Sequence, residues 1–271
     1  MNNFKIDKIG SDPEIFLINE QGMGVPSEHY FQGDKDSPED LGDGFQLLCD
    51  NVMVEFNTPP VESKEDFIRV HLKGLSFIKE RLPENINIDI VASKDFEPSM
   101  LKSKLAKKFG CMPDFDAWTD TPNVSPSSRR NWRSAAGHIH ISYENPSIPK
   151  SLFLSKLCDY FLGVPSVLLD EDTRRKEMYG KAGAIRLKKF GFEYRVLSNY
   201  WLRTEESMSL VYDQIQSVFK FANDNPEFNF EDSNEVIEII NTYNKEKAIK
   251  FINKYEDYMV IPSEIKEKVN G

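Results

Sequence analysis

Two histidines lie two residues apart in a segment of alternating polar and apolar side chains, Ala135–Ser142. In a β-strand, residues two apart share a face, so His138 and His140 should point to one side while Ile139 and Ile141 face the core. The chain has four histidines, and this segment holds half of them. Two imidazoles on one face can share a divalent metal, or divide between metal binding and anion binding. A solvated surface pair is the alternative interpretation.

The composition is typical of a soluble globular chain. Of the 271 residues, 39% are hydrophobic and 29% are charged, and this length suits one domain or a domain with an appendage. The net charge of -10 argues against a general binder of nucleic acids or anionic membranes. We therefore expect neither a nucleic acid nor a membrane as a partner.

The N-terminus and the cysteines predict a cytoplasmic location. Residues Met1–Lys5 contain no apolar signal region, and no apolar run approaches the roughly 18 residues that a membrane-spanning helix needs. The three cysteines, Cys49, Cys111 and Cys158, are widely spaced and form no C-x-x-C pair. This pattern is typical of reduced cysteines that serve only in packing.

Strand patterns dominate the first half of the chain. Apolar or alternating runs predict strands at residues 15–18, 52–56 and 86–90. Between the last two, Ser63 with Asp66 can cap a helix with a long apolar face. His71 lies on that face, and we expect it to be a packing residue.

Helix patterns dominate the end of the chain. A strongly apolar helix is predicted at residues 152–162, a longer one after Thr204, and shorter ones at 236–240 and 248–255. We predict an α+β protein in which residues 1–203 carry the site and residues 204–271 form a helical C-terminal extension packed on the sheet. The Pro-, Ser-, Asp- and Asn-rich stretch from Cys111 to Trp132 predicts a functional loop, since long loops inside a compact domain usually carry function.

Acidic residues recur where a strand would hold them against apolar neighbours. Asp12 and Glu14 are two residues apart and hence on one face of a strand, although an acidic pair at the start of a strand is often only solvated. Glu55 lies between Val54 and Phe56, where an unpaired buried carboxylate would be costly. A cation is therefore its expected partner, and Asp50 is close enough in sequence to contribute.

A second acidic and basic set follows the histidines. Glu193 and Arg195 are also two residues apart, and a structural salt bridge is the alternative interpretation. The strands could line a pocket with Glu193, His138 and the other acids on one wall and with Arg186 and Arg195 on another. Carboxylates with a histidine suit Mg²⁺ or Mn²⁺, and arginines suit phosphate. This set predicts phosphoryl transfer from a nucleotide, without a P-loop or protein-kinase signature.

Five segments occur in an order that resembles a known family. They are residues 11–17 (SDPEIFL), 50–57 (DNVMVEFN), 137–141 (GHIHI), 179–186 (YGKAGAIR) and 192–199 (FEYRVLSN). From about Gly10 to Trp201, this order resembles the phage phiEco32-like COOH-NH2 ligases of type 2, amidoligases of the glutamine-synthetase-like superfamily. If the chain is phage-encoded, the cytoplasm in question is that of the host.

The resemblance implies a curved antiparallel sheet of the glutamine-synthetase-like catalytic type, with packed helices, around ATP and two or three divalent metals. It implies one metal at Glu14 and Glu55, and a second, nearer the phosphates, at Asp12, His138 and Glu193. Asp12 replaces the longer Glu that is usual at the first of these positions. The chain also lacks a recognisable N-terminal domain of the kind that completes glutamine synthetase sites between subunits, so the oligomeric state does not carry over.

The resemblance also implies which residues meet the nucleotide. His140, Lys181, Arg186 and Arg195 would contact ATP or substrate, and Glu55 would act in catalysis with the two arginines. The implied reaction is transfer of the γ-phosphate to a carboxylate, followed by attack of an amine on the acyl phosphate. We expect small-molecule or peptide carboxylates and amines as substrates, and a carboxylate of the Asp114–Asp120 stretch as a candidate acceptor of the amine proton.

Three other functions use part of the same pattern. A guanidino or other small-molecule kinase of the same fold would release a phosphorylated product without needing an amine. A cupin-like metal oxygenase or hydrolase would use the histidines and a Glu but leave the arginines without a role. A nucleotide-binding phage protein without turnover would bind ATP and form no product.

Overall fold

Two large antiparallel sheets are connected by the chain near residue 12, and helices pack against them. The computed structural model describes residues 4–107, 114–123, 131–261 and 265–266. Its strands are β1 (Ile6–Ser11), β2 (Glu14–Asn19), β3 (Gly24–Val25), β4 (Glu39–Gly42), β5 (Phe45–Asp50), β6 (Met53–Asn57), β7 (Ile86–Asp89), β8 (Ser93–Asp95), β9 (Phe115–Asp116), β10 (Thr121–Pro122), β11 (Trp132–Ser134), β12 (Ile139–Tyr143), β13 (Ala184–Lys188) and β14 (Gly191–Tyr194). Its α-helices are α1 (Lys64–Lys79), α2 (Lys104–Lys107), α3 (Ile148–Cys158), α4 (Val164–Leu169), α5 (Glu205–Asp224), α6 (Ser233–Thr242) and α7 (Lys245–Lys254).

The first sheet has six strands in the order β1-β12-β14-β13-β9-β10. The predicted histidine strand is its second member, but it begins at Ile139, so His138 lies just before it rather than inside it. Ile139 and Ile141 are fully buried, as the alternation predicts. The Cys111–Trp132 stretch also contributes to this sheet, through β9 and β10. Its residues 111–113 and 124–130, Cys111 among them, lie outside the described residues.

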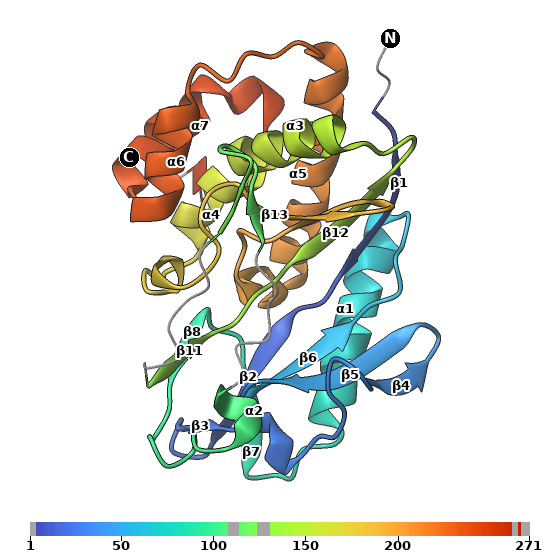
Figure 1. Ribbon diagram of the computed structural model, residues 1–271, viewed down its shortest axis with the longest axis vertical. Helices are drawn as coiled ribbons and strands as arrows, with labels where there is room; N and C mark the ends of the chain where they lie inside the picture. The colour runs from blue at the N-terminus through green and yellow to red at the C-terminus, as the bar shows by residue number, and fades with distance from the viewer. Residues whose placement is uncertain (1–3, 108–113, 124–130, 262–264, 267–271) are drawn as a thin grey trace.

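The second sheet also has six strands, in the order β3-β2-β6-β5-β4, with β7 paired to β2. The strands predicted at 15–18, 52–56 and 86–90 are all present in it as β2, β6 and β7. A separate two-stranded sheet pairs β8 with β11. The described part of the chain therefore holds three sheets, and Figure 1 shows the second one lying below the first.

Asp12 and Pro13 connect the two large sheets. They follow β1 of the first sheet and precede β2 of the second. Proline has no N–H to give to a sheet and favours an extended residue before it, so the ladder is interrupted here without the chain turning back. Helix α1 packs beside this crossing and begins as predicted, with the Ser63 side chain accepting the N–H of Asp66.

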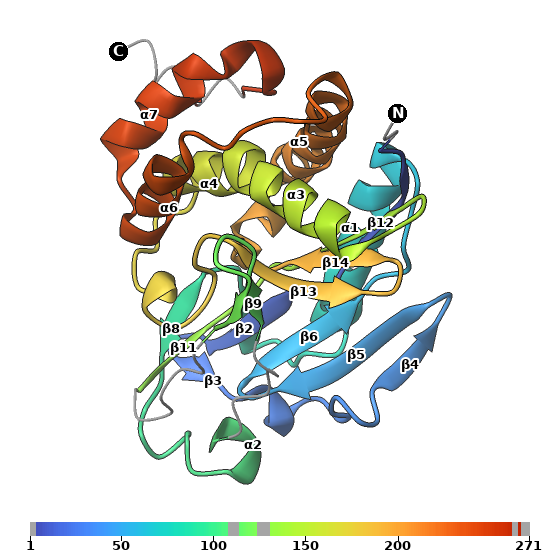
Figure 2. The same ribbon diagram turned by 45° about the horizontal axis from the view of Figure 1, so that its top comes forward.

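The C-terminal helices pack mainly on other helices. Helix α3 lies against β13 and β14, α5 packs against α1 and α3, and α6 and α7 pack against α4. Figure 2 shows this helical layer above the first sheet. The predicted extension is therefore helical, but α3 and α4 lie between much of it and the sheet. The boundary at residue 203 stays a prediction, because one apolar core joins β-strand residues such as Ile15 with Ile252 of α7.

One helical run is long and apolar enough to cross a membrane by length and composition. It spans Ile148–Leu169, 22 residues, which corrects the expectation that no apolar run approaches this length. It consists of α3, one π-helical turn (Asp159–Gly163) and α4. Because 78% of its most apolar stretch is buried inside the protein, the core accounts for its apolar character. The predicted α+β class is confirmed, and Cys49 and Cys158 are free and buried.

Candidate functional site

A row of polar side chains crosses the first sheet. His140 of β12 pairs with Gly10 of β1 on one side and with Glu193 of β14 on the other, and Arg186 of β13 pairs with Glu193 in turn. Residues directly opposite each other on antiparallel strands present their side chains on the same face. The strand register therefore brings His140, Glu193 and Arg186 together.

The first cluster forms where this row meets the crossing. Ligand atoms of Asp12, His140 and Glu193 lie within 4.8 Å of one another, close enough to share a cation. His140 Nε2 is 3.4 Å from Asp12 Oδ2 and 3.9 Å from Glu193 Oε2. His138 joins from the other side, with Nδ1 3.3 Å from Asp12 Oδ1 and 3.5 Å from Glu193 Oε1.

The charges of this cluster support one another. Burial opposes ionisation of Asp12, but His140 and His138 hold its pKa well below the usual range. Burial and the charge of Asp12 both act to raise the pKa of Glu193, yet His138 and Arg195 lower it to about 2. Burial and the Arg195 charge lower the pKa of His138 to about 4, which leaves it neutral. Against its burial, Asp12 raises the pKa of His140.

Cations surround Glu193, which is fully buried. Arg186 donates to both of its oxygens at 3.2 Å, Lys188 lies 3.0 Å from Oε2, and Arg195 donates to Oε1. Arg195 also lies 3.3 Å from Asp114 Oδ2, which anchors the start of the segment leading into β9. The two arginines therefore stand at the first cluster, as the motifs predict, and each is engaged with Glu193.

The second cluster lies on the second sheet. Glu14 and Glu55 are directly opposed on β2 and β6, and Asp50 ends the neighbouring strand β5. Ligand atoms of the three carboxylates lie within 4.8 Å of one another, and all three side chains are buried. Glu14 Oε2 accepts the N–H of Ala136 at 2.7 Å, and Lys35 lies 2.7 Å from Asp50 Oδ2.

The second cluster holds more negative charge than its neighbours offset. Burial, and then the charge of Asp50, raises the pKa of Glu14 to about 8. Burial raises the pKa of Glu55 well above its usual value, and Asp12, Asp50 and Glu14 add to the rise. Buried carboxylates in such proximity favour either protons or a bound cation.

The donor sets fit divalent metals. Asp12 Oδ1 and His140 Nε2 are buried without a hydrogen-bond partner among the described residues, so the first cluster presents unused ligand atoms. The second cluster offers three carboxylates, of which Glu14 and Glu55 have raised pKa values, and among the described residues Lys35 is the cation that pairs with Asp50. Carboxylate oxygen with one imidazole is a donor set for Mg²⁺ or Mn²⁺.

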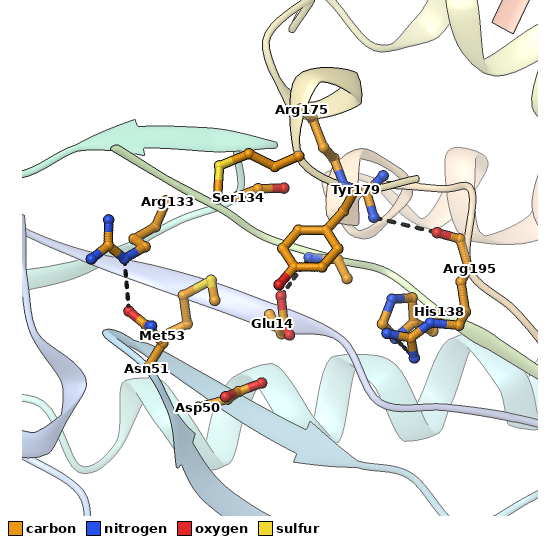
Figure 3. A pocket seen from close by; sticks show the side chains of 12 residues that line it. Glu14, Asp50, Asn51, Met53, Arg133, Ser134, His138, Arg175, Tyr179 and Arg195 are labelled. Carbon is orange, nitrogen blue, oxygen red and sulfur yellow. Dashed lines mark hydrogen bonds between the residues drawn. The ribbon is translucent and has the colours of Figure 1, made fainter. Parts of the chain in front are cut away.

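A pocket opens beside the two clusters (Figure 3). Glu14 and Asp50 form one side of it and His138 and Arg195 another, while Arg133 comes from β11 and Met178 and Tyr179 from the segment before β13. Figure 3 shows the Tyr179 ring inside the pocket with its hydroxyl turned toward Glu14. The pocket is lined by Glu14, Asp50, Asn51, Met53, Arg133, Ser134, Ala136, His138, Arg175, Met178, Tyr179 and Arg195.

The fold assembles most of the residues that the sequence singled out. Asp12, His138, His140, Glu193, Arg186 and Arg195 meet at the first cluster, and Glu14, Glu55 and Asp50 at the second. Lys181 does not join them: it is exposed in the loop before β13 and does not line the pocket. Lys188 was missed, although it follows Arg186 by two on the same strand. Arg133 carried no signal, because only tertiary folding brings β11 to the pocket, and Tyr179 begins the motif at 179–186 but was given no role of its own.

Comparisons with known proteins point to one family and one fold. Residues 127–257 match the family described as Phage phiEco32-like COOH.NH2 ligase-type 2. The chain is similar to the solved structure "Apo GmaS without ligand", with 11% identity, a TM-score of 0.50, and coverage of 94% of this chain and 64% of that chain. No curated protein sequence matches it.

Two further solved structures are similar at lower TM-scores. A bifunctional glutathione synthetase from Pasteurella multocida has 11% identity and a TM-score of 0.49, over 98% of this chain and 46% of that chain. A GmaS/ADP complex has 11% identity and a TM-score of 0.40, over 99% of this chain and 74% of that chain. The chain thus spans less than two thirds of the synthetase and of apo GmaS. Through residues 127–257 it is a match to the phage phiEco32-like COOH.NH2 ligase-type 2 family, which confirms the resemblance that its motifs indicate.

Proposed function

We propose that the protein is an ATP-dependent carboxylate–amine ligase that forms an amide or peptide-like bond through an acyl phosphate. The observation that supports this most directly is the adjacency of two acidic clusters, one of them bordered by arginines and the other by a pocket. Such an arrangement can hold a polyphosphate on one side and an organic substrate on the other. The family match over residues 127–257 supports the carboxylate–amine ligase activity in general.

Each cluster has residues suited to a divalent metal. Asp12, His138, His140 and Glu193 would hold one, and Glu14, Glu55 and Asp50 another. Bound there, Mg²⁺ or Mn²⁺ would offset the negative charge of the phosphates and of the carboxylate under attack. Without a metal, the raised pKa values of Glu14 and Glu55 favour a proton on these two acids.

The arginines would bind the transferred phosphoryl group. Arg186 and Arg195 both contact Glu193, so their guanidinium groups are fixed in direction before a phosphate arrives. A planar guanidinium gives two parallel hydrogen bonds to a phosphate and stabilises charge that spreads over its oxygens. Asp114, which pairs with Arg195, is the acid of the Asp114–Asp120 stretch nearest to this site and is our candidate to accept the amine proton.

The pocket would hold the organic substrates. Arg133 suits a substrate carboxylate on one side of the pocket, while Glu14 and Asp50, as metal ligands, would border the other. Met53, Met178 and the ring of Tyr179 supply apolar surface between them. Small-molecule or short peptide substrates therefore fit better than a large folded partner.

The reaction is tested through its intermediate. With ATP, Mg²⁺ and a panel of carboxylates, hydroxylamine should trap the acyl phosphate as a hydroxamate without the natural amine. A carboxylate labelled with ¹⁸O should pass one label to the released phosphate, because that oxygen leaves with the phosphoryl group. Amide formation with unlabelled phosphate would rule out the acyl phosphate. A stable phosphorylated product without hydroxamate would instead identify a kinase.

A further inference from the structure

We propose that His71 is a positioning residue, which acts through the Ser11 hydroxyl to fix the Asp12 carboxylate in the first cluster. The inference rests on the proposed function, because it concerns the metal centre of that ligase. It goes beyond the packing role that the apolar face of α1 predicts for His71.

The hydrogen bonds of His71 define its protonation. His71 is fully buried, with Nδ1 2.6 Å from the carbonyl oxygen of Phe67 and Nε2 in contact with Ser11 Oγ. A carbonyl oxygen only accepts, so Nδ1 carries the proton and Nε2 accepts the hydroxyl proton of Ser11. Burial lowers the pKa of His71 to about 4, so this neutral form persists at neutral pH. The imidazole is thus a fixed acceptor aimed at one hydroxyl.

Ser11 holds the last position of β1 before the crossing. Its side chain and that of Asp12 point to opposite faces, because consecutive residues of an extended chain alternate. Its backbone is tied as well: Ser11 N donates to Thr58 Oγ1 at 3.1 Å, and Thr58 N donates to Ser11 O at 3.0 Å. Pro13, on the far side of Asp12, has no N–H to offer. The hydrogen bond between the Ser11 hydroxyl and His71 therefore fixes the orientation of Ser11, and with it the backbone that leads into Asp12.

His71 is also connected to the segment that carries His138, through Trp201. The rings of His71 and Trp201 meet edge to face, 4.9 Å apart, and Trp201 Nε1 donates to Gly137 O at 3.1 Å. Gly137 immediately precedes His138, and a Cβ there would lie 2.4 Å from Trp201 Nε1. One buried cluster thus contacts the residue before Asp12 and the residue before His138.

Packing alone does not explain a histidine at this position. A leucine would fill the apolar space without two ring nitrogens, whose burial is costly unless both are hydrogen-bonded. Both nitrogens of His71 are satisfied, one within α1 and one by Ser11. The polar contact across to β1 is therefore the feature that distinguishes His71 from its apolar neighbours.

The test measures Mn²⁺ binding by the electron paramagnetic resonance of free Mn²⁺, alongside thermal unfolding of the metal-free protein. Ser11→Ala removes only a hydroxyl and should fold. We expect Mn²⁺ affinity to fall about tenfold in Ser11→Ala and in His71→Leu, at the lower end of the range for partners that orient metal ligands. His71→Gln, which keeps a donor and an acceptor, should restore most of the affinity.

Two further variants separate positioning from stability. Ser11→Ala combined with His71→Leu leaves neither group unsatisfied, so thermal stability should recover while Mn²⁺ affinity stays low. Ile78→Ala, on the same buried face of α1, should lower stability and leave Mn²⁺ affinity unchanged. Wild-type affinity in Ser11→Ala and in the double variant would overturn the positioning role alone. A wild-type protein that binds no Mn²⁺ would overturn the metal centre and this role with it.

Discussion

Arg195 makes contacts that fit two different roles. Its guanidinium meets Glu193, Asp114 and His138, and its own carbonyl oxygen accepts from the buried Arg175. These contacts fit either a purely structural role or a role in orienting the side chain to bind phosphate. The sequence alone left the same two alternatives open for the Glu193 and Arg195 pair.

Substitution of Arg195 by lysine distinguishes them. Lysine keeps the charge beside Glu193 but loses the two-pronged contact, so kcat/KM in the ligase assay should fall at least about tenfold, or roughly 1.4 kcal/mol of transition-state stabilisation. The accompanying loss of unfolding free energy should be smaller. Arg174→Lys is the matched control, because Arg174 pairs with the exposed Asp95 away from the clusters. Normal turnover with a lowered melting temperature would make Arg195 part of the scaffold.

Single elements show what the sequence could predict. Alternation and capping placed β2, β6, β7 and α1 nearly where they lie, because each pattern is local. The Asp12 and Glu14 spacing suggested one shared face, whereas the crossing at Pro13 sends the two side chains to different clusters. His138 lies outside its predicted strand yet reaches the same cluster as His140. The positions of these side chains depend on how distant strands pair, and a local sequence pattern does not specify that pairing.

The β9–β10 segment is an element whose attachment can be tested. Trp118, between its strands, donates from Nε1 to the buried Asp159 at 2.6 Å, and Asp159 also accepts from Tyr194 and Gly183. This bond holds the segment that begins with Asp114.

Trp118→Phe should loosen that segment. Loss of one hydrogen bond to a carboxylate should cost about 1–3 kcal/mol of unfolding free energy, measured by chemical denaturation. Proteolysis within residues 114–123 should accelerate, because the strand pairing of β9 with β13 covers only two residue pairs. Phe230→Leu is the control, since it removes the ring that packs on Trp118 and keeps the hydrogen bond. Equal proteolysis of the two variants would show that packing, and not the Asp159 bond, anchors the segment.

At the scale of the whole molecule, the buried acids link stability to pH. In the metal-free protein the pKa of Glu14 is raised from 4.5 to about 8, and that of Glu55 is also raised. Folded Glu14 therefore keeps a proton that the unfolded chain loses, and the free energy of unfolding falls as pH rises through this window. His71 and His138, with pKa values of about 4, have the opposite effect, which is complete once unfolded histidine is neutral.

The melting temperature in the presence of a chelator should therefore decrease from pH 6.5 to pH 8. Above pH 6.5 the opposing contribution of the two histidines no longer increases. Glu14→Gln, which keeps an oxygen for the Ala136 N–H, should flatten this decrease. Mg²⁺ should also remove it, because a bound cation replaces the proton. A decrease of equal slope in Glu14→Gln would assign the pH dependence to other groups.

The crossing from β1 to β2 limits how chains of this fold can vary in length. One residue inserted between Asp12 and Glu14 would turn Glu14 to the opposite face of β2, among the core side chains around Ile15. One residue removed would do the same, so an insertion or deletion here abolishes one cluster while the other survives. The loop that carries Tyr179 has no such constraint. Length differences that alter substrate choice are therefore expected at the pocket rim, with the spacing of two from Asp12 to Glu14 unchanged.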